Sequence, residues 1–254
     1  MVNVDRVYQK VLALANKEQR GYITPQEFNL FADMAQMEIF EQYFYDLNQF
    51  NRLPGNQTSH SDMRDLLEGK ISAFEIWATN PNTTLLNDFG DINLEDFFNF
   101  YRLVEVRVNY GNNLGYRVAE EMTTKEFRKY SESPLAKESE RRPIYIHYFD
   151  SYDRIKIYPF PPKTTPNTGF DDIRISYIRK PKSPKWTYIV TAAPHNTALY
   201  NPTAPDISHF ELHASEESEL VYRILALAGI SLQKPEVLQS AVGLEAAKVQ
   251  QEKS

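Results

Sequence analysis

The sequence predicts an α+β protein with an N-terminal helical hairpin, a central antiparallel β-sheet and C-terminal helices. Apolar residues recur at helical spacing near the N-terminus and again after residue 214, whereas between residues 143 and 213 they alternate with polar residues, as in half-buried strands. Four segments follow: a helical hairpin at 1–52, a mixed α/β connecting region at 53–142, an antiparallel β-meander with a long proline-rich loop at 143–213, and C-terminal helices with a tail at 214–254.

A helix start signal opens the longest helical pattern of the chain. Thr24 is suited to the N-cap, a proline follows at the first helical position, and Glu27 stands at the third, where its carboxylate can bond back to the cap. Apolar residues then recur with a helical period through Phe50. An earlier apolar stripe over residues 4–15 predicts the partner helix, so the sequence predicts a helical hairpin.

The turn of this hairpin has the spacing of a calcium-binding loop. Asn16, Glu18 and Arg20 would occupy ligand positions, Gly21 the sharp turn and Glu27 position twelve. Arg20 would place positive charge where the cation must sit, and Glu27 already has a capping role. We therefore expect a plain turn, and a calcium- or peptide-binding module stays open as an alternative.

The connecting region carries shorter patterns. They predict helices at 63–68 and 93–101, strands at 71–77 and 103–110, and a helix opened by a capping box of Thr123 and Glu126 that ends before Pro134. In the second strand, Val104, Val106 and Val108 are expected to share one face.

From residue 143 the alternation of a sheet dominates. Strands are predicted at 144–149, 154–158, 172–179 and 186–190, forming an antiparallel meander with one apolar face. The connection at 160–170 is long for a hairpin and is stiffened by prolines, so a contact role and a plain loop both stay open. Phe160, Pro161 and Pro162 are therefore candidate interaction residues.

Residues 179–185 form the one basic cluster in a chain whose net charge is negative. Their sequence, RKPKSPK, is expected to form a solvated hairpin turn. The functional alternative is a basic patch that contacts nucleic acid or an acidic partner through Arg179, Lys180, Lys182 and Lys185.

The C-terminal segment predicts two helices. Ser215 is suited to cap the first, with acidic residues in its first turn. The second begins near Pro235 and carries Val237 and Leu238 in an apolar stripe, which would suit clamping onto a neighbouring protein.

Catalytic and metal-binding patterns are sparse. His209, Glu211 and His213 would share one face of a strand, but a polar strand edge is the favoured interpretation because no further ligand has suitable spacing. His147 is expected to be a half-buried packing residue. Four aspartates flank the predicted strand ends and are expected to form turns, although two could pair as general acid and base; they are Asp150, Asp153, Asp171 and Asp172. No catalytic residue, cofactor or metal is predicted.

The amino-acid composition argues against several classes of function. The net charge of −6 argues against general coating of nucleic acid, and the absence of cysteine excludes disulfides and thiolate sites. Aromatic residues make up 13% of the chain, which leans toward a protein that binds other proteins. No run is long enough to span a bilayer and no signal peptide is seen, so assembly in a cytoplasm is expected.

Three stretches resemble virion structural proteins of tailed bacteriophages, in particular the neck-ring or head–tail adaptor proteins of crAss-like and related short-tailed phages. They are the N-terminal VNVDRVYQKVLALANKEQRGYITPQEFNLFADMAQMEIFEQYF, the segment RIKIYPFPP…DIRISYIRKPKSPKW, and the ending from ISHFELH to KVQQEK. Together they cover a little over half of the chain, and none is a catalytic signature.

The resemblance implies a non-enzymatic subunit of a homo-oligomeric ring, commonly twelve-fold, at the head–tail junction of the virion. Its implied partners are the portal protein, other neck and tail proteins, and viral DNA in transient passage; no membrane is implied. Two other classes stay open: a tail-associated carbohydrate-active enzyme that uses carboxylates of the sheet, and the calcium- or peptide-binding module described above.

Overall fold

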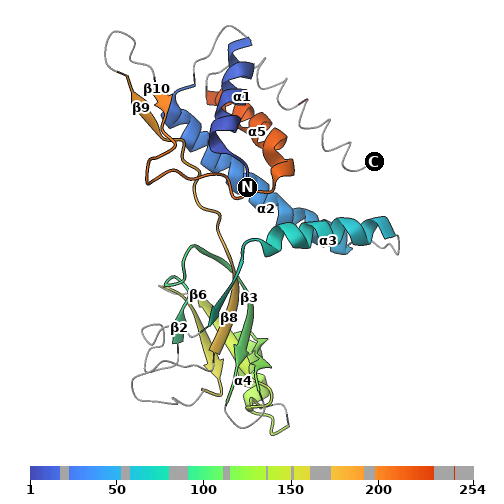
Figure 1. The fold of residues 1–254 in the computed structure, drawn as a ribbon. Coiled ribbons are helices and arrows are strands. Elements are labelled where there is room, and N and C mark those ends of the chain that lie inside the picture. The colour runs from blue at the N-terminus through green and yellow to red at the C-terminus, as the bar shows by residue number, and fades with distance from the viewer. Residues whose placement is uncertain are drawn as a thin grey trace. The chain divides into compact units, whose positions relative to one another are not determined.

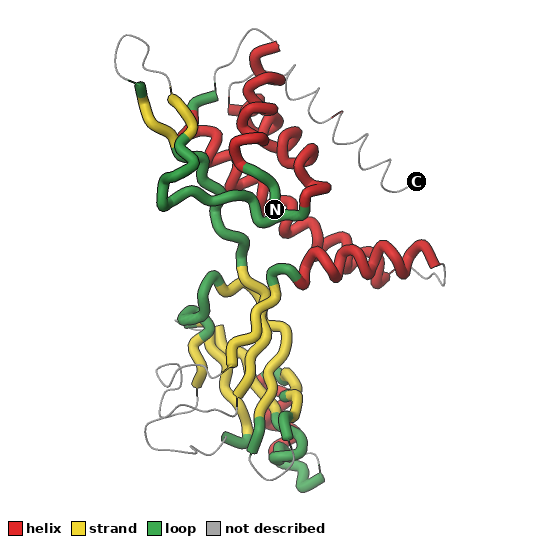
Figure 2. Tube along the Cα trace, in the orientation of Figure 1, coloured by secondary structure: helices red, strands yellow, loops and turns green. Residues whose placement is uncertain are grey.

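The computed structural model describes residues 1–17, 23–52, 58–79, 91–110, 115–135, 137–149, 152–160, 173–191, 198–231 and 243. The chain forms two compact units, one from residues 1–71 with 181–254 and one from residues 72–180. We call them the helical unit and the β unit (Figures 1 and 2). The predicted α+β class is confirmed, but the helical unit is assembled from both ends of the chain, so its limits differ from those of the four sequence segments.

The helical unit contains four helices and a short strand pair among its described residues. The helices are α1 (Val4–Lys17), α2 (Pro25–Arg52), α3 (Thr58–Ser72) and α5 (Glu217–Ser231), the last preceded by a 3₁₀ turn at Ala214–Glu216. Strands β9 (Tyr188–Val190) and β10 (Ala198–Tyr200) pair antiparallel. Both α1 and α2 pack against α5, and the two predicted N-terminal helices are present.

One face of each helix forms the core of this unit. Val4, Val7 and Val11 of α1 are fully buried, as are Phe28 and Ile39 of α2. Leu220 and Ile224 of α5 complete the same helical pattern of burial. The apolar stripes read from the sequence therefore become the packed faces, as expected for amphipathic helices.

The β unit is built from two four-stranded sheets. The first has the order β1-β8-β3-β4 and the second β2-β7-β6-β5. Their bounds are β1 Glu75–Thr79, β2 Asp91–Asn93, β3 Phe100–Val108, β4 Arg117–Val118, β5 Glu120–Glu121, β6 Ile144–Phe149, β7 Asp153–Tyr158 and β8 Ile173–Arg179, with helix α4 at Thr124–Ser131. All pairs are antiparallel except β5 with β6.

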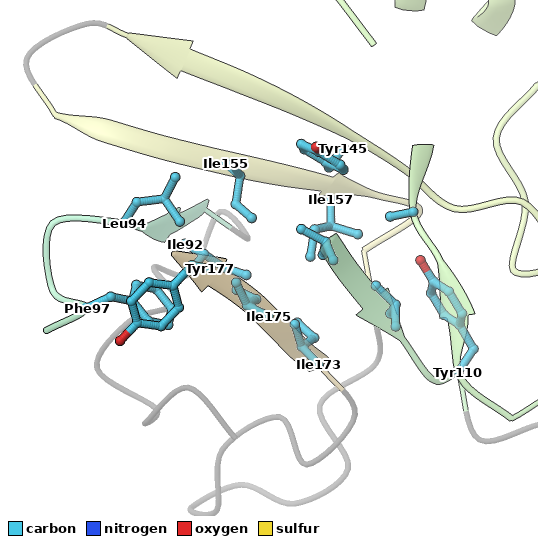
Figure 3. Close-up of a cluster of buried hydrophobic side chains, with 13 residues drawn as sticks. Ile92, Leu94, Phe97, Tyr110, Tyr145, Ile155, Ile157, Ile173, Ile175 and Tyr177 are labelled. Atoms are coloured by element: carbon cyan, nitrogen blue, oxygen red, sulfur yellow. The ribbon is translucent and has the colours of Figure 1, made fainter. Parts of the chain in front are cut away.

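The two sheets share one apolar core. Ile173, Ile175 and Tyr177 alternate along β8, and Ile155 and Ile157 along β7, and all five belong to the same buried cluster (Figure 3). Because alternate residues of a strand point to opposite faces, this leaves one outward face on each sheet. Over the second sheet, Ile144 and Ile146 are buried on that outward side, and Phe127 of α4 lies 4.5 Å from the ring of Tyr158.

The predicted meander is wrong in its pairing. Only β6 and β7 form the expected hairpin, whereas β8 lies between β1 and β3, and β9 pairs with β10 in the helical unit. Alternation predicts that a segment is a strand, but it does not select the partner, which depends on long-range burial.

The predicted helix at 93–101 is also wrong. Asn93 Oδ1 accepts a hydrogen bond from the N–H of Glu95 at 3.1 Å, as its capping pattern indicates, but consecutive turns follow and β3 starts at Phe100. Asn99 has a φ of 51°, a left-handed conformation that ends a helix and that asparagine tolerates. Leu94 and Phe97 are buried in the sheet core, which explains the periodic pattern.

Three further predictions differ from the structure in the bounds of an element or in the exposure of a side chain. The helix predicted at 63–68 extends over Thr58–Ser72 as α3, and the strand predicted at 71–77 begins later, at Glu75. Val104 is 47% exposed although Val106 and Val108 are buried, because the register of β3 shifts between Leu103 and Glu105.

The predicted capping signals have different outcomes. The capping box of Thr123 and Glu126 is confirmed in both directions. At the C-terminal helices, His213 rather than Ser215 caps the first turn. The predicted helix near residue 235, with Val237 and Leu238, lies outside the described residues.

Candidate functional site

Trp186 anchors the strand pair of the helical unit. Its indole Nε1 donates to Asp5 Oδ1 at 2.9 Å, and its ring centroid lies 4.3 Å from that of Tyr8. Tyr188 and Tyr200, opposite each other on β9 and β10, both stack on the indole. One face of the strand pair is therefore fixed to the core of this unit.

The opposite face of the same strand pair is apolar and open to solvent. Ile189 and Leu199 are direct cross-strand partners, and both side chains are more than half exposed. We call these two residues the β9–β10 pair. Exposed aliphatic side chains on a rigidly anchored element are typical of a contact surface, because their exposure to water is unfavourable.

The outward face of the first sheet is a second exposed surface, which we call the open sheet face. It consists of Trp77, Arg107, Tyr116, Val118 and Arg174. Register places Arg107 opposite both Arg174 and Val118, so these three share one side of the sheet. The guanidinium of Arg107 lies 4.9 Å from the centre of the Trp77 ring, and that of Arg174 lies 3.9 Å from the centre of Tyr116.

The open sheet face also carries two carboxylates, since Glu105 alternates with Arg107 along β3 and Glu75 with Trp77 along β1. Arg107 forms an ion pair with Glu105 at 2.9 Å. The Nε atom of Arg174 is buried and has no hydrogen-bond partner among the described residues. Two like charges directly opposite on a sheet are unfavourable without added anions. Tryptophan, tyrosine and arginine are also the side chains most enriched where proteins bind each other.

A polar cluster lies on the outward side of the second sheet. Asp91 is nearly fully buried, and its Oδ2 accepts from Arg154 at 2.8 Å, while Lys156 Nζ lies 3.7 Å from its Oδ1. Burial, aided by Tyr148 and by the charges of Asp91 and Glu138, raises the pKa of Tyr158 to about 12. Asp91 Oδ1 and Glu138 Oε2 are buried without a hydrogen bond among the described residues.

The basic cluster at 179–185 does not form the expected hairpin turn. Arg179 and Lys180 end the β unit, whereas Lys182 and Lys185 belong to the helical unit, so the four cations are divided between the two units. Pro181 and Pro184 are buried, and Lys185 forms a bridge with Ser208 and an ion pair with Asp206. Extended backbone pairing replaces the turn.

The remaining predicted contact residues lie at the edge of the described chain. Phe160 is 40% exposed, and Pro161 and Pro162 fall outside the described residues. A contact role for this loop stays a prediction.

The histidine-based metal pattern does not assemble. His209 accepts a hydrogen bond from the N–H of Val4 at 3.4 Å, Glu211 accepts from the N–H of Lys182 at 2.9 Å, and His213 is the cap described above. No group of three or more metal-ligating side chains occurs in the part of the chain that the structure describes.

The other titratable candidates have local partners or lie outside the described residues. Asp153 hydrogen-bonds to His147, whose ring lies 4.0 Å from that of Phe149. Asp150, Asp171 and Asp172 fall outside the described residues.

The calcium-loop pattern is described only at its end. Glu18, Arg20 and Gly21 lie outside the described residues, as does the side chain of Asn16. Glu27 forms the predicted capping box: its Oε2 accepts from the N–H of Thr24 at 2.9 Å, and Thr24 Oγ1 accepts from the N–H of Glu27 at 3.3 Å. The hydrogen bonds that Glu27 Oε2 accepts from the N–H and, at 2.8 Å, from the hydroxyl of Thr24 lower the pKa of the Glu27 carboxyl.

Sequence reasoning missed the exposed surfaces. Trp77 and Ile189 were both predicted to lie in strands, but a strand pattern does not tell which face stays uncovered. One signal in the sequence could have indicated the exposed face of β1. Glu75 and Trp77 lie two residues apart and therefore on the same side of the strand, opposite Ile76, and a charged residue on one side of a strand indicates that this side is exposed.

No known protein family matches the chain, and no curated protein does. Among the described residues, no helix is both long enough and apolar enough to cross a bilayer.

Proposed function

We propose that this chain is a non-enzymatic structural subunit of a ring at the portal–tail junction of a short-tailed bacteriophage. In this role it extends the DNA channel below the portal and gives the tail a docking surface, and its location is the head–tail junction of the virion. The proposal rests on the resemblance of the three stretches named above. The uncovered apolar and aromatic side chains of both units support it.

The observation that carries most weight is the β9–β10 pair. Ile189 and Leu199 are held outward by an element that Trp186 fixes from behind, so their exposure is built into the fold. A subunit whose neighbours bury such residues recovers the free energy of that burial, about 25 cal/mol per Å² of apolar surface. Ring assembly would supply these neighbours, because head-to-tail contacts close into a ring when the rotation permits.

Peptide quantification by mass spectrometry on purified virus particles tests this proposal. We expect a ratio to the portal protein near one to one, as for a neck ring that shares the symmetry of the portal. A ratio far above one would indicate capsid decoration or tail-shaft material. Absence from the particles would refute the structural role.

One observation favours the enzyme alternative. Asp91 and Glu138 both act on the hydroxyl of Tyr158, and each has a buried oxygen without a hydrogen bond among the described residues. A glycosidase requires two carboxyl groups that flank the scissile bond. Arg154 and Lys156 neutralise Asp91, however, so an ion-pair cluster that stabilises the sheet is the simpler interpretation.

A turnover assay separates these two interpretations. Purified protein incubated with host surface polysaccharide should release no reducing ends, and Asp91→Asn should not change this result. Release that is lost in Asp91→Asn, with the fold intact by circular dichroism, would establish the enzyme.

A further inference from the structure

The β unit is one continuous stretch of chain inserted into the helical unit. The helical unit is formed by residues 1–71 with 181–254, and the β unit by residues 72–180. The chain therefore crosses between the units twice, once at the end of α3 and once just after β8. A segment inserted in this way can fold as a domain of its own if its two ends meet and if it encloses its own core.

The two ends of the β unit are joined by its own hydrogen bonds. Next to the β1–β8 ladder, the N–H of Arg179 donates to the carbonyl oxygen of Phe74 at 3.0 Å. The guanidinium of Arg179 also lies 5.9 Å from the centre of the Phe74 ring. The N–H of Lys180, the last residue of this unit, donates to the carbonyl oxygen of Asn99 at 2.7 Å. Contacts within the β unit thus close it at the point where the chain enters and leaves.

The helical unit binds the chain on its own side of the second crossing. The N–H of Lys182 donates to Glu211 Oε2 at 2.9 Å, and its carbonyl oxygen accepts from Gln36 Nε2 at 2.8 Å. Gln36 is fully buried, and its Oε1 accepts from the N–H of Glu211 at 3.1 Å. The N–H groups of Lys180 and Lys182 are therefore bound in different units, and only Pro181, which has no N–H, lies between them.

The first crossing is fixed on the helical side by the last turn of α3. Lys70 Nζ forms an ion pair with Glu216 Oε1 at 2.5 Å and lies 5.2 Å from the centre of the Tyr43 ring. Glu216 is 4% exposed, and separating a buried ion pair is unfavourable because it leaves an uncompensated charge. The connection between this ion pair and the bound carbonyl of Phe74 is therefore limited to residues 71–73.

Each unit also encloses an apolar core. The buried cluster that joins the two sheets lies entirely within residues 72–180 and includes Ile155 and Ile175 (Figure 3). The core of the helical unit is formed by its own helices, with Val7, Phe28 and Ile224 fully buried. A single core in a segment of about a hundred residues is typical of a domain that folds alone.

We propose that the β unit is an inserted domain that folds and unfolds independently of the helical unit. The limits of this domain are residues 72–73 at the first crossing and Pro181 at the second. This division does not depend on the proposed ring and goes beyond it. The β9–β10 pair and the open sheet face then belong to separately folding domains, so local unfolding of one domain leaves the exposed surface of the other intact.

Urea unfolding of the full chain tests this proposal, because each unit contains one of the two tryptophans. Trp186 reports on the helical unit in a Trp77→Phe background, and Trp77 reports on the β unit in a Trp186→Phe background. Ile175→Ala removes a fully buried side chain from the core of the β unit. It should lower the urea midpoint of Trp77 emission by about 1 M or more and leave the midpoint of Trp186 emission unchanged.

The matched control is the same substitution in the other core. Ile224→Ala removes an equally buried side chain from α5, and it should lower only the midpoint of Trp186 emission. Equal shifts of both midpoints in either variant would indicate a single cooperative unit and overturn the proposal. A substitution that unfolds its own unit outright should still leave the other transition in place, and loss of both transitions would likewise overturn the proposal.

Discussion

Asn29 and Trp186 bind each other through both backbone polar groups of the tryptophan. Asn29 Oδ1 accepts from the N–H of Trp186 at 2.8 Å, and Asn29 Nδ2 donates to its carbonyl oxygen at 3.1 Å. The amide side chain thus takes the place of a neighbouring strand. This pair connects α2 to the segment that leads into β9, although 157 positions separate the two residues.

Asn29→Ala should lower the free energy of unfolding of the helical unit by about 2 kcal/mol or more. The substitution leaves an N–H and a carbonyl of a buried residue without partners, and each such group costs about 1–3 kcal/mol. Urea unfolding in a Trp77→Phe background would show the effect, since Trp186 is then the only tryptophan. Asn48→Ala, at an exposed position of the same helix, is the control and should change the stability little.

The two tryptophans should report different environments. Trp186 is 2% exposed and Trp77 is 46% exposed. In Trp77→Phe, the remaining emission should be blue-shifted and resist quenching by acrylamide. In Trp186→Phe, it should be red-shifted and readily quenched at low protein concentration. Equal quenching of the two variants would contradict the placement of both residues.

Trp186→Phe should also destabilise the helical unit, because it removes the hydrogen bond to Asp5, whereas Trp77 belongs to the β unit.

Acid should weaken the caps of α2 and α4. Hydrogen bonds from Thr24 and Thr123 lower the pKa of Glu27 and of Glu126 below the ordinary 4.5. A carboxyl whose pKa is lower in the folded state stabilises the fold above its ordinary pKa, and this contribution is lost as the pH falls through the folded value. The loss therefore lies at and below about pH 4.5.

Thermal unfolding followed by circular dichroism between pH 3 and pH 7 would measure this effect. Glu27→Gln should flatten the pH dependence, because the amide does not titrate. Glu95→Gln, at an exposed acid for which the structure shows no side-chain hydrogen bond to a cap, is a matched control. An identical slope in Glu27→Gln and the unmodified protein would contradict the capping contribution.

The phenol of Tyr158 should ionise with a pKa of about 12 rather than 10, because it is partly buried and lies beside Tyr148 and the carboxylates of Asp91 and Glu138. A raised pKa means that the folded state holds the phenolic proton more tightly. Stability from this group is therefore present below pH 10 and is lost as the pH rises from 10 toward 12. A difference titration of phenolate absorbance against Tyr158→Phe measures the shift.

Asp91→Asn should lower the pKa of Tyr158, because it removes one of the nearby negative charges. It should also destabilise the β unit, since it removes the ion pairs that the nearly fully buried Asp91 carboxylate forms with Arg154 and Lys156. An unchanged pKa of Tyr158 in this variant would show that Asp91 does not act on the phenol.

The sequence was sufficient to predict the helices and caps whose signals lie within a few residues of each other. Helix α2 begins where Thr24 and Glu27 predict, α4 has the predicted capping box, and the stripes of α1 and α2 are the buried faces. These features depend on spacing within a few residues, because a helix satisfies its own backbone and its cap is three residues away. The same reasoning failed at 93–101, where Leu94 and Phe97 have helical spacing but lie in turns packed on a sheet.

The tertiary structure decided which strands pair when the partners are distant from each other in the sequence. Strand β8 could have paired with β7, its neighbour in sequence, but lies between β1 and β3, which buries Ile173 and Ile175 against the second sheet. The same pairing sets Arg174 opposite Arg107 and leaves Trp77 uncovered. By itself, the sequence determined helices α1, α2 and α4, the strand segments β6, β7 and β8, and the absence of cysteine chemistry. Which side chains meet, and which remain exposed for a partner, depended on burial summed over residues far apart in the chain.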